Sequence, residues 1–398
     1  MRLIGRSKLL RTLISWQHQD VIKVITGVRR SGKSTLFDLY ENYLYRQGVR
    51  PEQIIRINLE DLARYHFQTY EQLHDYVLNL IRHQCQYYVL IDEVQMIDGW
   101  QRAINSLFLR KNVDIYITGS NAHILSGELA TLLSGRFVTI NVFPYSFAEY
   151  TQVLPQISDR QQLYNHYVMR GGFPYAASLS DPQQAAVYLR DLYNTIILKD
   201  VVTRRKVQDV ALLERLVLYL MDNIGNLAST HSIVTSFQQN GNLVSGNTID
   251  GYLSALTNAY IFYRADRYDI RGRQLLKTGD KYYVVDLGLR YYLLRARVQD
   301  QGRLLENVVY LELLRRGYQV YVGQADKYEI DFVAIKANAV EYYQVAASVR
   351  QKETLERELR SLLQVKDNHP KTLITLDYDP EMDYDGIKQK FVLDWLLE

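Results

Sequence analysis

The stretch VIKVITGVRRSGKST, residues 21–35, constrains the fold of this chain more than any other feature. Its apolar run stops at Gly27, and Gly32 is followed directly by Lys33 and Ser34, which gives the spacing G-x-x-x-x-G-K-[ST]. This pattern predicts a buried strand before Gly27, then a loop that can take positive φ, then a helix from Ser34 onward. One short glycine-rich turn is therefore expected to join a strand to a helix.

Such a turn suits the binding of a phosphate. Backbone N–H groups of the loop converge on the anion, and the helix N-terminus adds positive potential. Lys33 would reach the β and γ phosphates of a nucleotide, and Ser34 would bind Mg²⁺. The sequence therefore predicts that the chain uses ATP and Mg²⁺. The residues expected to bind the nucleotide are Gly27, Arg30, Ser31, Gly32, Lys33, Ser34 and Thr35.

A second apolar stretch, YYVLIDE at residues 87–93, ends in two acids and looks like a Walker B strand. Continuous apolar residues are typical of a strand buried on both faces, and ligands of a parallel sheet bind at the carboxyl ends of its strands. We expect Asp92 to hold Mg²⁺ through water and Glu93 to polarise the attacking water. The alternative is that the two acids only cap the next helix, and the presence of Lys33 upstream argues against it.

Composition limits the class of protein. A chain of 398 residues is too long for one ordinary core, so two or three domains are expected. A net charge of +3 permits an acidic partner without requiring one. The single cysteine, Cys85, excludes an internal disulfide framework. No apolar segment reaches membrane-spanning length, and MRLIGRSKLL is too short in apolar residues for a signal peptide, so we expect a cytoplasmic protein without a membrane partner.

Strands and helices are predicted to alternate through the first part of the chain. Upstream of them, Ser7 is a candidate N-cap of a short helix. After the first strand and helix, the expected elements are strand 54–58, helix 70–83, strand 87–92, helix 100–111, strand 114–118 and strand 138–142. This order is typical of an α/β fold in which helices cover both faces of a parallel sheet.

Two further residues are candidates for the chemistry. The strand that ends at Gly119 is followed by Ser120 and Asn121, and either side chain could contact the γ-phosphate or the water. From spacing alone, a turn residue chosen for its backbone is an equal alternative. Arg136 is an isolated cation after Gly135, and composition does not distinguish it from a solvated arginine.

The motifs IGR, GVRRSGKST, LIDEVQ, ITGSNA, SGRF, FPYSFAEY and RGGFP together resemble the prokaryotic AAA+ ATPases that carry a C-terminal region of unknown function. The resemblance runs nearly from end to end of the chain. It implies that Asn121, or Ser120, is the sensor 1 residue and that Arg136 is an arginine finger for the nucleotide of a neighbouring subunit. Subunits would then assemble in a ring, for which a hexamer is expected.

Residues 147–206 are predicted to be helical and to form the small lid of such an ATPase, interrupted at Gly171, Gly172 and Pro174. No G-x-x-R motif for a sensor 2 residue occurs in this lid. Possible substitutes, which the sequence does not rank, are Arg190, Arg204 and Arg205.

Residues 207–300 have the pattern of a winged helix, with helices at 212–223, 230–239 and 247–258 and strands at 261–267 and 281–286. The basic connection RYDIRGRQLLKTGDK would be a wing that meets DNA phosphates. Its candidate DNA-binding residues are Arg267, Arg271, Arg273, Lys277 and Lys281. The third helix is poor in Arg and Lys, which argues against sequence-specific reading of DNA bases. Use of the winged helix for packing or ring assembly remains an open alternative.

Residues 301–398 resemble the core of PD-(D/E)xK nucleases in their predicted order of helix 304–316, strands 319–322, 329–335 and 340–346, helix 352–364 and strand 372–376. Glu306 lies on the first helix, and Glu329 and Asp331 project from one strand face because they are two residues apart. The position of the family's third motif holds Gln344 and Ala346 instead of a carboxylate and a lysine.

The remnant of a nuclease site is therefore predicted to comprise Glu306, Asp331 and Gln344. Because metal-dependent cleavage needs at least two carboxylates and commonly a lysine, we expect this region not to cut DNA. A lysine could come from another element, with Lys336 and Lys352 as the nearby candidates in the sequence.

Four regions are expected: an AAA+ P-loop core at 1–146, a helical lid at 147–206, a winged-helix domain at 207–300 and a PD-(D/E)xK-like domain at 301–398. The function expected is an oligomeric AAA+ ATPase that couples ATP hydrolysis to the remodelling or translocation of nucleic acid, DNA above all. Two alternatives remain open: a nucleotide-dependent regulatory switch that binds a protein partner, and a DNA nuclease gated by ATP.

Overall fold

The structure is a computed structural model. It describes residues 4–122, 133, 135–203, 207–239, 241, 244–276, 279–294 and 301–398. Its contacts divide the chain into two compact units, Met1–Pro144 with Asn258–Tyr260, and Tyr145–Thr257 with Ile261–Glu398. This division does not test the finer boundaries expected between a lid, a winged helix and a nuclease-like domain, which stay predictions.

The first unit is built around a parallel sheet that has five strands among the described residues, in the order β2-β3-β4-β1-β5. Its strands are β1 (Ile22–Thr26), β2 (Ile54–Asn58), β3 (Tyr87–Asp92), β4 (Val113–Gly119) and β5 (Phe137–Asn141). Its helices are α1 (Ser7–Ser15), α2 (Lys33–Arg46), α3 (Tyr70–Leu80) and α4 (Trp100–Phe108), with short 3-10 turns at Pro51–Gln53 and Val94–Met96. The predicted α/β fold is confirmed.

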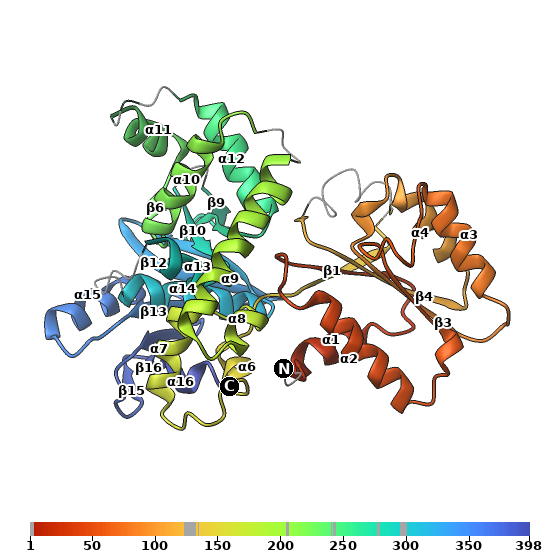
Figure 1. Ribbon diagram of the computed structural model, residues 1–398. Helices are drawn as coiled ribbons and strands as arrows, with labels where there is room; N and C mark the ends of the chain where they lie inside the picture. The colour runs from red at the N-terminus through yellow and green to blue at the C-terminus, as the bar shows by residue number, and fades with distance from the viewer. Residues whose placement is uncertain are drawn as a thin grey trace. The chain divides into compact units, whose positions relative to one another are not determined.

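The two faces of this sheet carry separate cores. Side chains alternate along each strand, so Ile22 and Val24 of β1 enter the core under α3 and α4, whereas Ile25 enters the core under α1 and α2. Both helical layers are visible in Figure 1. One expectation is corrected at the start of α1: Ser7 is the first helical residue, and Arg6, with φ of 40°, is the N-cap.

The second unit begins with helices. They are α6 (Phe147–Tyr150), α7 (Arg160–Arg170), α8 (Pro174–Ser178) and α9 (Pro182–Thr195), followed by a π-helical segment at Ile196–Thr203. Next come α10 (Val210–Asp222), β6 (Leu227–Ala228), α11 (Thr230–Gln239), α12 (Gly246–Asn258), β7 (Phe262–Ala265), β8 (Arg267–Asp269), β9 (Gln274–Leu275), β10 (Asp280–Val284) and α13 (Leu287–Leu294). The helices α10, α11 and α12 are followed by β7, which pairs antiparallel with β10, in the order expected from the sequence. The short strand β6 joins β10 in the same small sheet.

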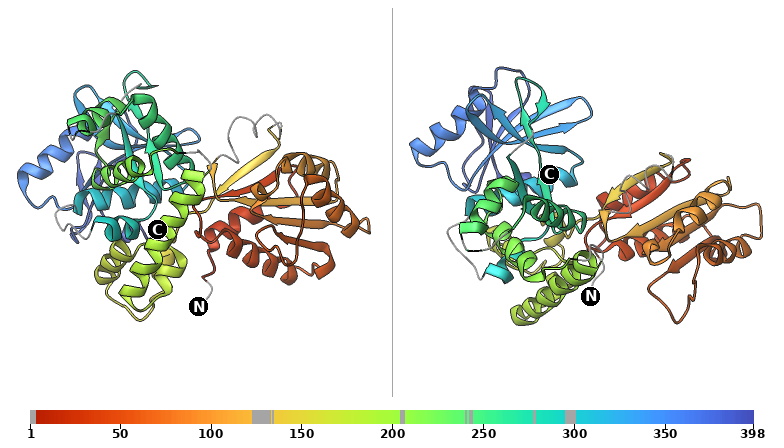
Figure 2. Two further views of the ribbon diagram at one scale, coloured as in Figure 1. Left: turned by 45° about the horizontal axis from the view of Figure 1, so that its top comes forward. Right: turned by 90° about the horizontal axis from the view of Figure 1, so that it is seen from above.

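The C-terminal part contains α14 (Gln301–Arg315), β11 (Gln319–Ala325), β12 (Tyr328–Lys336), β13 (Ala339–Ala346), α15 (Lys352–Leu363), β14 (Lys371–Thr375), β15 (Met382–Tyr384), β16 (Ile387–Phe391) and α16 (Val392–Trp395). Its strands form a mixed sheet in the order β15-β16-β14-β13-β12-β11-β8-β9. Figure 2 shows the strands after α14 and α15 in shades of blue from two directions. The last two strands and α16 were not expected from the sequence.

The predicted strand 261–267 is corrected by the structure. It breaks at Asp266, so that β7 pairs with β10 in the small sheet while β8 pairs with β11 in the large one. The basic connection after Arg267 therefore belongs to the edge of the large sheet.

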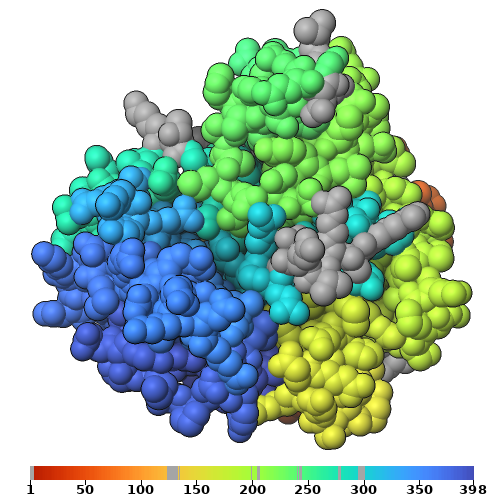
Figure 3. Space-filling model, turned by 90° about the vertical axis from the view of Figure 1, so that its left-hand side faces the viewer, coloured from red at the N-terminus to blue at the C-terminus, as the bar shows by residue number. Residues whose placement is uncertain are grey.

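The C-terminal helix α16 lies beside α7. Arg160 of α7 forms an ion pair of 2.7 Å with Asp394 of α16, and Figure 3 shows the blue C-terminal segments next to yellow ones on this face.

Candidate nucleotide-binding site

The loop between β1 and α2 has the backbone that the glycine spacing predicts. Three of its residues, Gly27, Arg30 and Gly32, have φ of 145°, 65° and 98°. A Cβ added at Gly27 would lie 2.1 Å from the carbonyl oxygen of Val142, so a side chain cannot fit there. The loop therefore runs close to the end of β5, and Gly32 caps α2.

The polar groups inside this loop fit a phosphate ligand. Lys33 is 4% exposed, and its Nζ donates to the carbonyl oxygens of Gly27 and Val28 at 3.1 and 3.2 Å. Ser31 Oγ is buried without a hydrogen-bond partner among the described residues. Because an unpaired buried hydroxyl is costly, this oxygen is suited to a ligand that the loop would enclose. Ser34, the expected magnesium ligand, is exposed next to Lys33.

The two acids lie at the carboxyl end of β3, beside the end of β4. Thr118 Oγ1 donates to Asp92 Oδ1 and accepts from the backbone N–H of Glu93 at 3.0 Å. Ser120 Oγ donates to Glu93 Oε1 at 2.6 Å. The same Oε1 lies 3.8 Å from Lys33 Nζ, so the structure brings the phosphate loop and the acidic pair together.

Glu93 is held in an ionised state. Burial alone would raise the pKa of this carboxyl, but the Lys33 ammonium and the hydrogen bonds from Ser120 and Gln95 outweigh burial and lower it. Its backbone has φ of 57°, an uncommon conformation for a residue other than glycine. A charged carboxylate in a fixed position suits a group that orients water.

The structure separates two candidates that the sequence left as alternatives. Ser120 contacts the carboxylate of Glu93, whereas Asn121 is buried one residue further along the same chain segment. A hydrogen bond therefore links Ser120 directly to the carboxylate of Glu93. The sensor role itself stays a prediction for both residues.

Arg136 lies at the amino ends of the strands, opposite the end that carries the phosphate loop. It is exposed and directly precedes β5, where its carbonyl oxygen accepts from the backbone N–H of Ile22 at 2.8 Å. Because β5 and β1 are parallel and Thr26 is at the far end of β1, a rise of about 3.3 Å per residue puts Arg136 roughly 15 Å from the loop. The structure therefore does not bring Arg136 to the nucleotide site of its own chain.

Sequence reasoning gave no role to Arg6, which is 4% exposed. Its guanidinium donates to the carbonyl oxygens of Ser31 at 2.8 Å and of Phe143 at 2.7 Å, so it ties the phosphate loop to the segment after β5. The IGR motif marked this residue, but a contact between residues so distant in sequence is visible only in the fold.

Arg56 was also missed. It lies on β2, where Nη2 donates to the carbonyl oxygen of Ser34 at 3.2 Å and lies 3.3 Å from Asp38 and 4.0 Å from Asp92. The available signal was a lone arginine in the apolar strand IIRIN. Arg56 thus adds a positive charge next to the expected magnesium ligands.

The described residues among those predicted for DNA binding differ in burial and in their partners. Arg273 is exposed, Arg271 is exposed but paired with Asp326 at 2.6 Å, and Arg267 is half-buried. Lys281 is 3% exposed and surrounded by carboxylates, so its predicted contact with DNA phosphate is corrected. Lys277 lies outside the described residues. So do two of the three sensor 2 substitutes, Arg204 and Arg205, while Arg190 is exposed and paired with Asp191 at 2.9 Å.

The nuclease-like residues do come together. Asp331 N donates to Gln344 Oε1 at 3.3 Å, and Glu306 and Asp331 both lie near the Nζ of Lys281. Neither lysine proposed from the sequence enters this cluster. Lys336 donates to the carbonyl oxygen of Arg316 at 2.7 Å, and Lys352 lies 3.9 Å from Glu356 on an exposed helix face.

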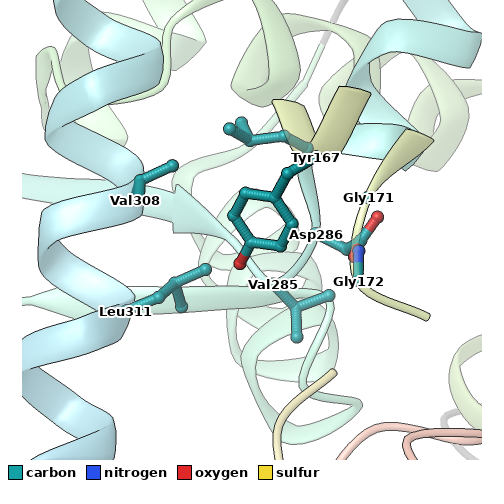
Figure 4. Close-up of a pocket in the computed structure, with 8 residues that line it drawn as sticks. Tyr167, Gly171, Gly172, Val285, Asp286, Val308 and Leu311 are labelled. Atoms are coloured by element: carbon teal, nitrogen blue, oxygen red, sulfur yellow. The ribbon is translucent and has the colours of Figure 1, made fainter. Parts of the chain in front are cut away.

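The RGGFP motif has a packing role in the second unit. Asp286 accepts from the backbone N–H groups of Gly172 at 2.6 Å and of Gly288 at 2.9 Å. A Cβ at Gly171 would lie 1.9 Å from Asp286 Oδ1, so the motif needs glycine there. Figure 4 shows Gly171, Gly172 and Asp286 among the residues around a cavity of about 10 Å³, which holds at most one water molecule. The cavity is too small for a nucleotide.

No helix among the described residues is long and apolar enough to cross a membrane. Comparison with solved structures finds weak similarity. The Aeropyrum pernix ORC1 protein in complex with DNA matches with a TM-score of 0.34 and 14% identity over 74% of this chain and 93% of that chain. Cdc6p from Pyrobaculum aerophilum matches with a TM-score of 0.32 and 12% identity over 78% of this chain and 95% of that chain.

Sequence comparison gives stronger matches. A family model described as an AAA domain matches residues 19–151, and one described as a domain of unknown function (DUF8612) matches residues 161–300. Uncharacterized protein MJ1544 of Methanocaldococcus jannaschii is 26% identical over 85% of this chain and 77% of its own length. An uncharacterized protein of Haemophilus influenzae is 41% identical over 100% of this chain and 99% of its own length. The chain therefore belongs to the family of this Haemophilus influenzae protein, with an AAA domain followed by a domain of unknown function.

Proposed function

We propose that the protein is a cytoplasmic, oligomeric AAA+ ATPase that couples ATP hydrolysis to the binding and the remodelling or translocation of DNA. One observation carries the ATPase part of this proposal. Lys33 Nζ and Glu93 Oε1 lie 3.8 Å apart, between a phosphate loop with an unpaired buried hydroxyl and an acidic pair at the end of a parallel strand. This combination suits phosphoryl chemistry.

Each residue of the site then has a defined task. The Lys33 ammonium exchanges its two carbonyl acceptors for phosphate oxygens, and the N–H groups of the loop bind the same anion. Ser34 and Asp92 hold Mg²⁺, which when bound neutralises charge on the β and γ phosphates. Glu93 orients the attacking water, and Ser120 keeps its carboxylate in place.

We infer that Arg136 serves the nucleotide bound by a neighbouring subunit. Its side chain is exposed, and it lies roughly 15 Å along parallel strands from the phosphate loop of its own chain. An arginine at this distance contributes to hydrolysis only when it belongs to another copy. The proposal therefore requires a closed assembly, and a hexameric ring is the form we propose.

The DNA part of the proposal rests on the second unit. Arg271 and Arg273 lie in the connection between β8 and β9, on the edge of the large sheet. A sequence-independent grip on the phosphate backbone fits a third helix, α12, that contains no Arg or Lys. The nuclease-like region, with Gln344 in place of an acid, would contribute to this grip without cutting.

The test is ATP turnover measured at low salt with and without duplex, single-stranded and branched DNA. A motor on DNA is expected to show stimulated turnover. Arg271→Gln and Arg273→Gln should weaken DNA binding about equally for all sequences, and each should lower the salt slope by roughly one. Turnover and affinity that ignore both DNA and these substitutions would contradict the DNA part of the proposal.

A nucleotide-dependent switch that binds a protein partner is the second candidate. It is favoured by the pairing of Arg271 with Asp326 and by the burial of Lys281, because both reduce the charge available to DNA. For a switch, ATP should change the oligomeric state measured by light scattering, and DNA should leave turnover unchanged.

A further inference from the structure

One lysine of the second unit is enclosed by acids. Lys281, on β10, has its Nζ 2.9 Å from Glu306 Oε1, 2.8 Å from Glu329 Oε1 and 3.7 Å from Asp331 Oδ1. Glu306 is on α14, and the other two acids lie on one face of β12. The three carboxylates therefore converge on a single ammonium that comes from a different sheet.

Two of the three acids also accept hydrogen bonds from other groups of the protein. Glu306 Oε1 accepts from the hydroxyl of Tyr283 at 2.7 Å, and Asp331 Oδ2 accepts from the backbone N–H of Val345 at 2.8 Å. A Cβ added at Gly225 would lie 3.1 Å from Glu306 Oε2, so the backbone closes this side of the cluster.

Gln344, at the position where a nuclease would carry an acid, joins this network as a neutral group. Its amide oxygen accepts from the backbone N–H of Asp331 at 3.3 Å, and its Nε2 donates to Glu358 Oε2 at 2.8 Å. A further carboxylate at this point would add negative charge to a buried cluster that one ammonium already balances only in part.

The ammonium keeps its charge inside the protein. Burial alone would lower the pKa of Lys281, but Glu306, Asp331 and Glu329 outweigh burial and raise it above the ordinary value. Burial and the neighbouring Glu306 carboxylate raise the pKa of Asp331 well above its ordinary value, although Lys281 opposes this.

A hard divalent cation binds in the same way, at a point where carboxylate oxygens from several elements converge. Here the ammonium occupies that point and supplies the donors that the oxygens need. With Lys281 in place, no group of three or more His, Cys, Asp and Glu side chains among the described residues is arranged to hold a metal ion.

We propose that the Lys281 ammonium takes the place of a metal ion in this cluster, so that the chain keeps the carboxylates of a hydrolytic site but closes them to divalent cations. This inference rests on the proposed function, in which the C-terminal region does not cut DNA, and it gives a physical cause for that inactivity. It also assigns Lys281 a task that neither DNA binding nor catalysis requires.

The experiment is a Mn²⁺ titration of the full chain without nucleotide, followed by the loss of the free-ion signal in electron paramagnetic resonance. Wild type and Asp331→Asn are expected to bind Mn²⁺ identically. Lys281→Met should gain one site that binds Mn²⁺ about tenfold tighter, or more, than any in wild type, because three carboxylates lose their cation. Lys281→Met combined with Asp331→Asn should lose this gain.

Two outcomes would overturn the proposal. One is a Mn²⁺ site in wild type that disappears in Asp331→Asn, since the cluster would then hold metal beside its lysine; this comparison does not depend on the folding of the lysine variant. The other is a folded Lys281→Met protein without a new site. ATP turnover in wild type is measured separately, so a failure of the proposed ATPase function would leave the Mn²⁺ comparison readable.

Discussion

Lys33 and Lys281 are both nearly inaccessible to solvent, yet their partners differ in kind. Lys33 donates to two backbone carbonyls of a glycine-rich loop and lies 3.8 Å from one carboxylate, that of Glu93. Lys281 contacts three carboxylates, which are carried by a helix and a strand. Lys33 therefore has two carbonyl acceptors that a ligand can replace, whereas Lys281 has three charged partners within regular structure.

The difference shows what a buried lysine can indicate. A hydrogen bond to a carbonyl contributes only about 1 kcal/mol net, so a phosphate can displace it and gain a charge-assisted contact. A buried ion pair differs, because removal of one partner leaves the other charge uncompensated. We infer that Lys33 serves a ligand and that Lys281 serves the fold, which gives each lysine a distinct mutant phenotype.

The largest expected effect is on the site of Lys33. Lys33→Ala should abolish tight ATP binding and turnover, because the charge on the β and γ phosphates has no substitute. It should lower the melting temperature less than Lys281→Met does, because only Glu93, at 3.8 Å, loses a nearby cation. Binding is measured with a fluorescent ATP analogue and folding by thermal denaturation. A large loss of stability in this variant would erase the contrast with Lys281.

The matched variant is Glu93→Gln, which keeps Lys33 and Asp92 but removes the group that orients water. ATP should bind with affinity near that of wild type and stay uncleaved, with turnover reduced by roughly a hundredfold to ten-thousandfold. Equal loss of ATP binding in both variants would show that Glu93 has been given the wrong role.

Arg136→Ala comes next and tests whether the Lys33 site is complete within one chain. Turnover should fall on the order of a thousandfold or more, while the isolated subunit should bind nucleotide almost as wild type does. Mixing Arg136→Ala with Lys33→Ala subunits should recover part of the activity, because each copy supplies what the other lacks. Mixed oligomers without recovery would favour a local structural role for Arg136.

Lys281→Met is expected to show the opposite phenotype to Lys33→Ala: lower stability with unchanged ATP binding. Loss of the ammonium should destabilise the protein by about 3–5 kcal/mol, because buried carboxylates lose their counter-ion. ATP affinity at a temperature where the variant is folded should be unchanged. The control is Lys352→Met, which alters an exposed side chain and should change stability by less than about 0.5 kcal/mol. Similar unfolding free energies for the two variants, measured in urea, would contradict the structural role.

Much of the fold could be predicted because hydrophobic periodicity reports local structure directly. The predicted strand 54–58 coincides with β2, and the acids that end the apolar run 87–92 lie at the carboxyl edge of the sheet. The predicted strand 261–267 failed because its break at Asp266 depends on two sheets that compete for it. The short polar strand β16, IKQKF, has too few apolar residues to be recognised by pattern.

The site was partly accessible for the same reason. A motif with fixed spacing, such as the one around Lys33, encodes its own geometry, so its residues could be named in advance. The role of Lys281 could not be predicted, because the sequence of a basic stretch does not show whether a lysine is exposed to water or buried among acids of α14 and β12. The contact of Arg6 with Ser31 likewise depends on chain segments that only the folded protein brings together.

The smallest expected effect concerns Asp286, a buried acid stabilised by backbone N–H groups instead of a lysine. Burial raises the pKa of this carboxyl to about 6, well above its ordinary value, although the N–H groups oppose this. Folding therefore favours the protonated carboxyl, and the stability it contributes is fully present below about pH 4 and lost as pH rises through 6. Relative to Asp286→Asn, wild type should lose roughly 2.4 kcal/mol of unfolding free energy between pH 4 and pH 7. Urea unfolding at several pH values measures this difference, with the exposed Asp98→Asn as control. A wild-type difference from Asp286→Asn that does not change with pH would show that backbone N–H groups fully replace the cation that Lys281 supplies to its acids.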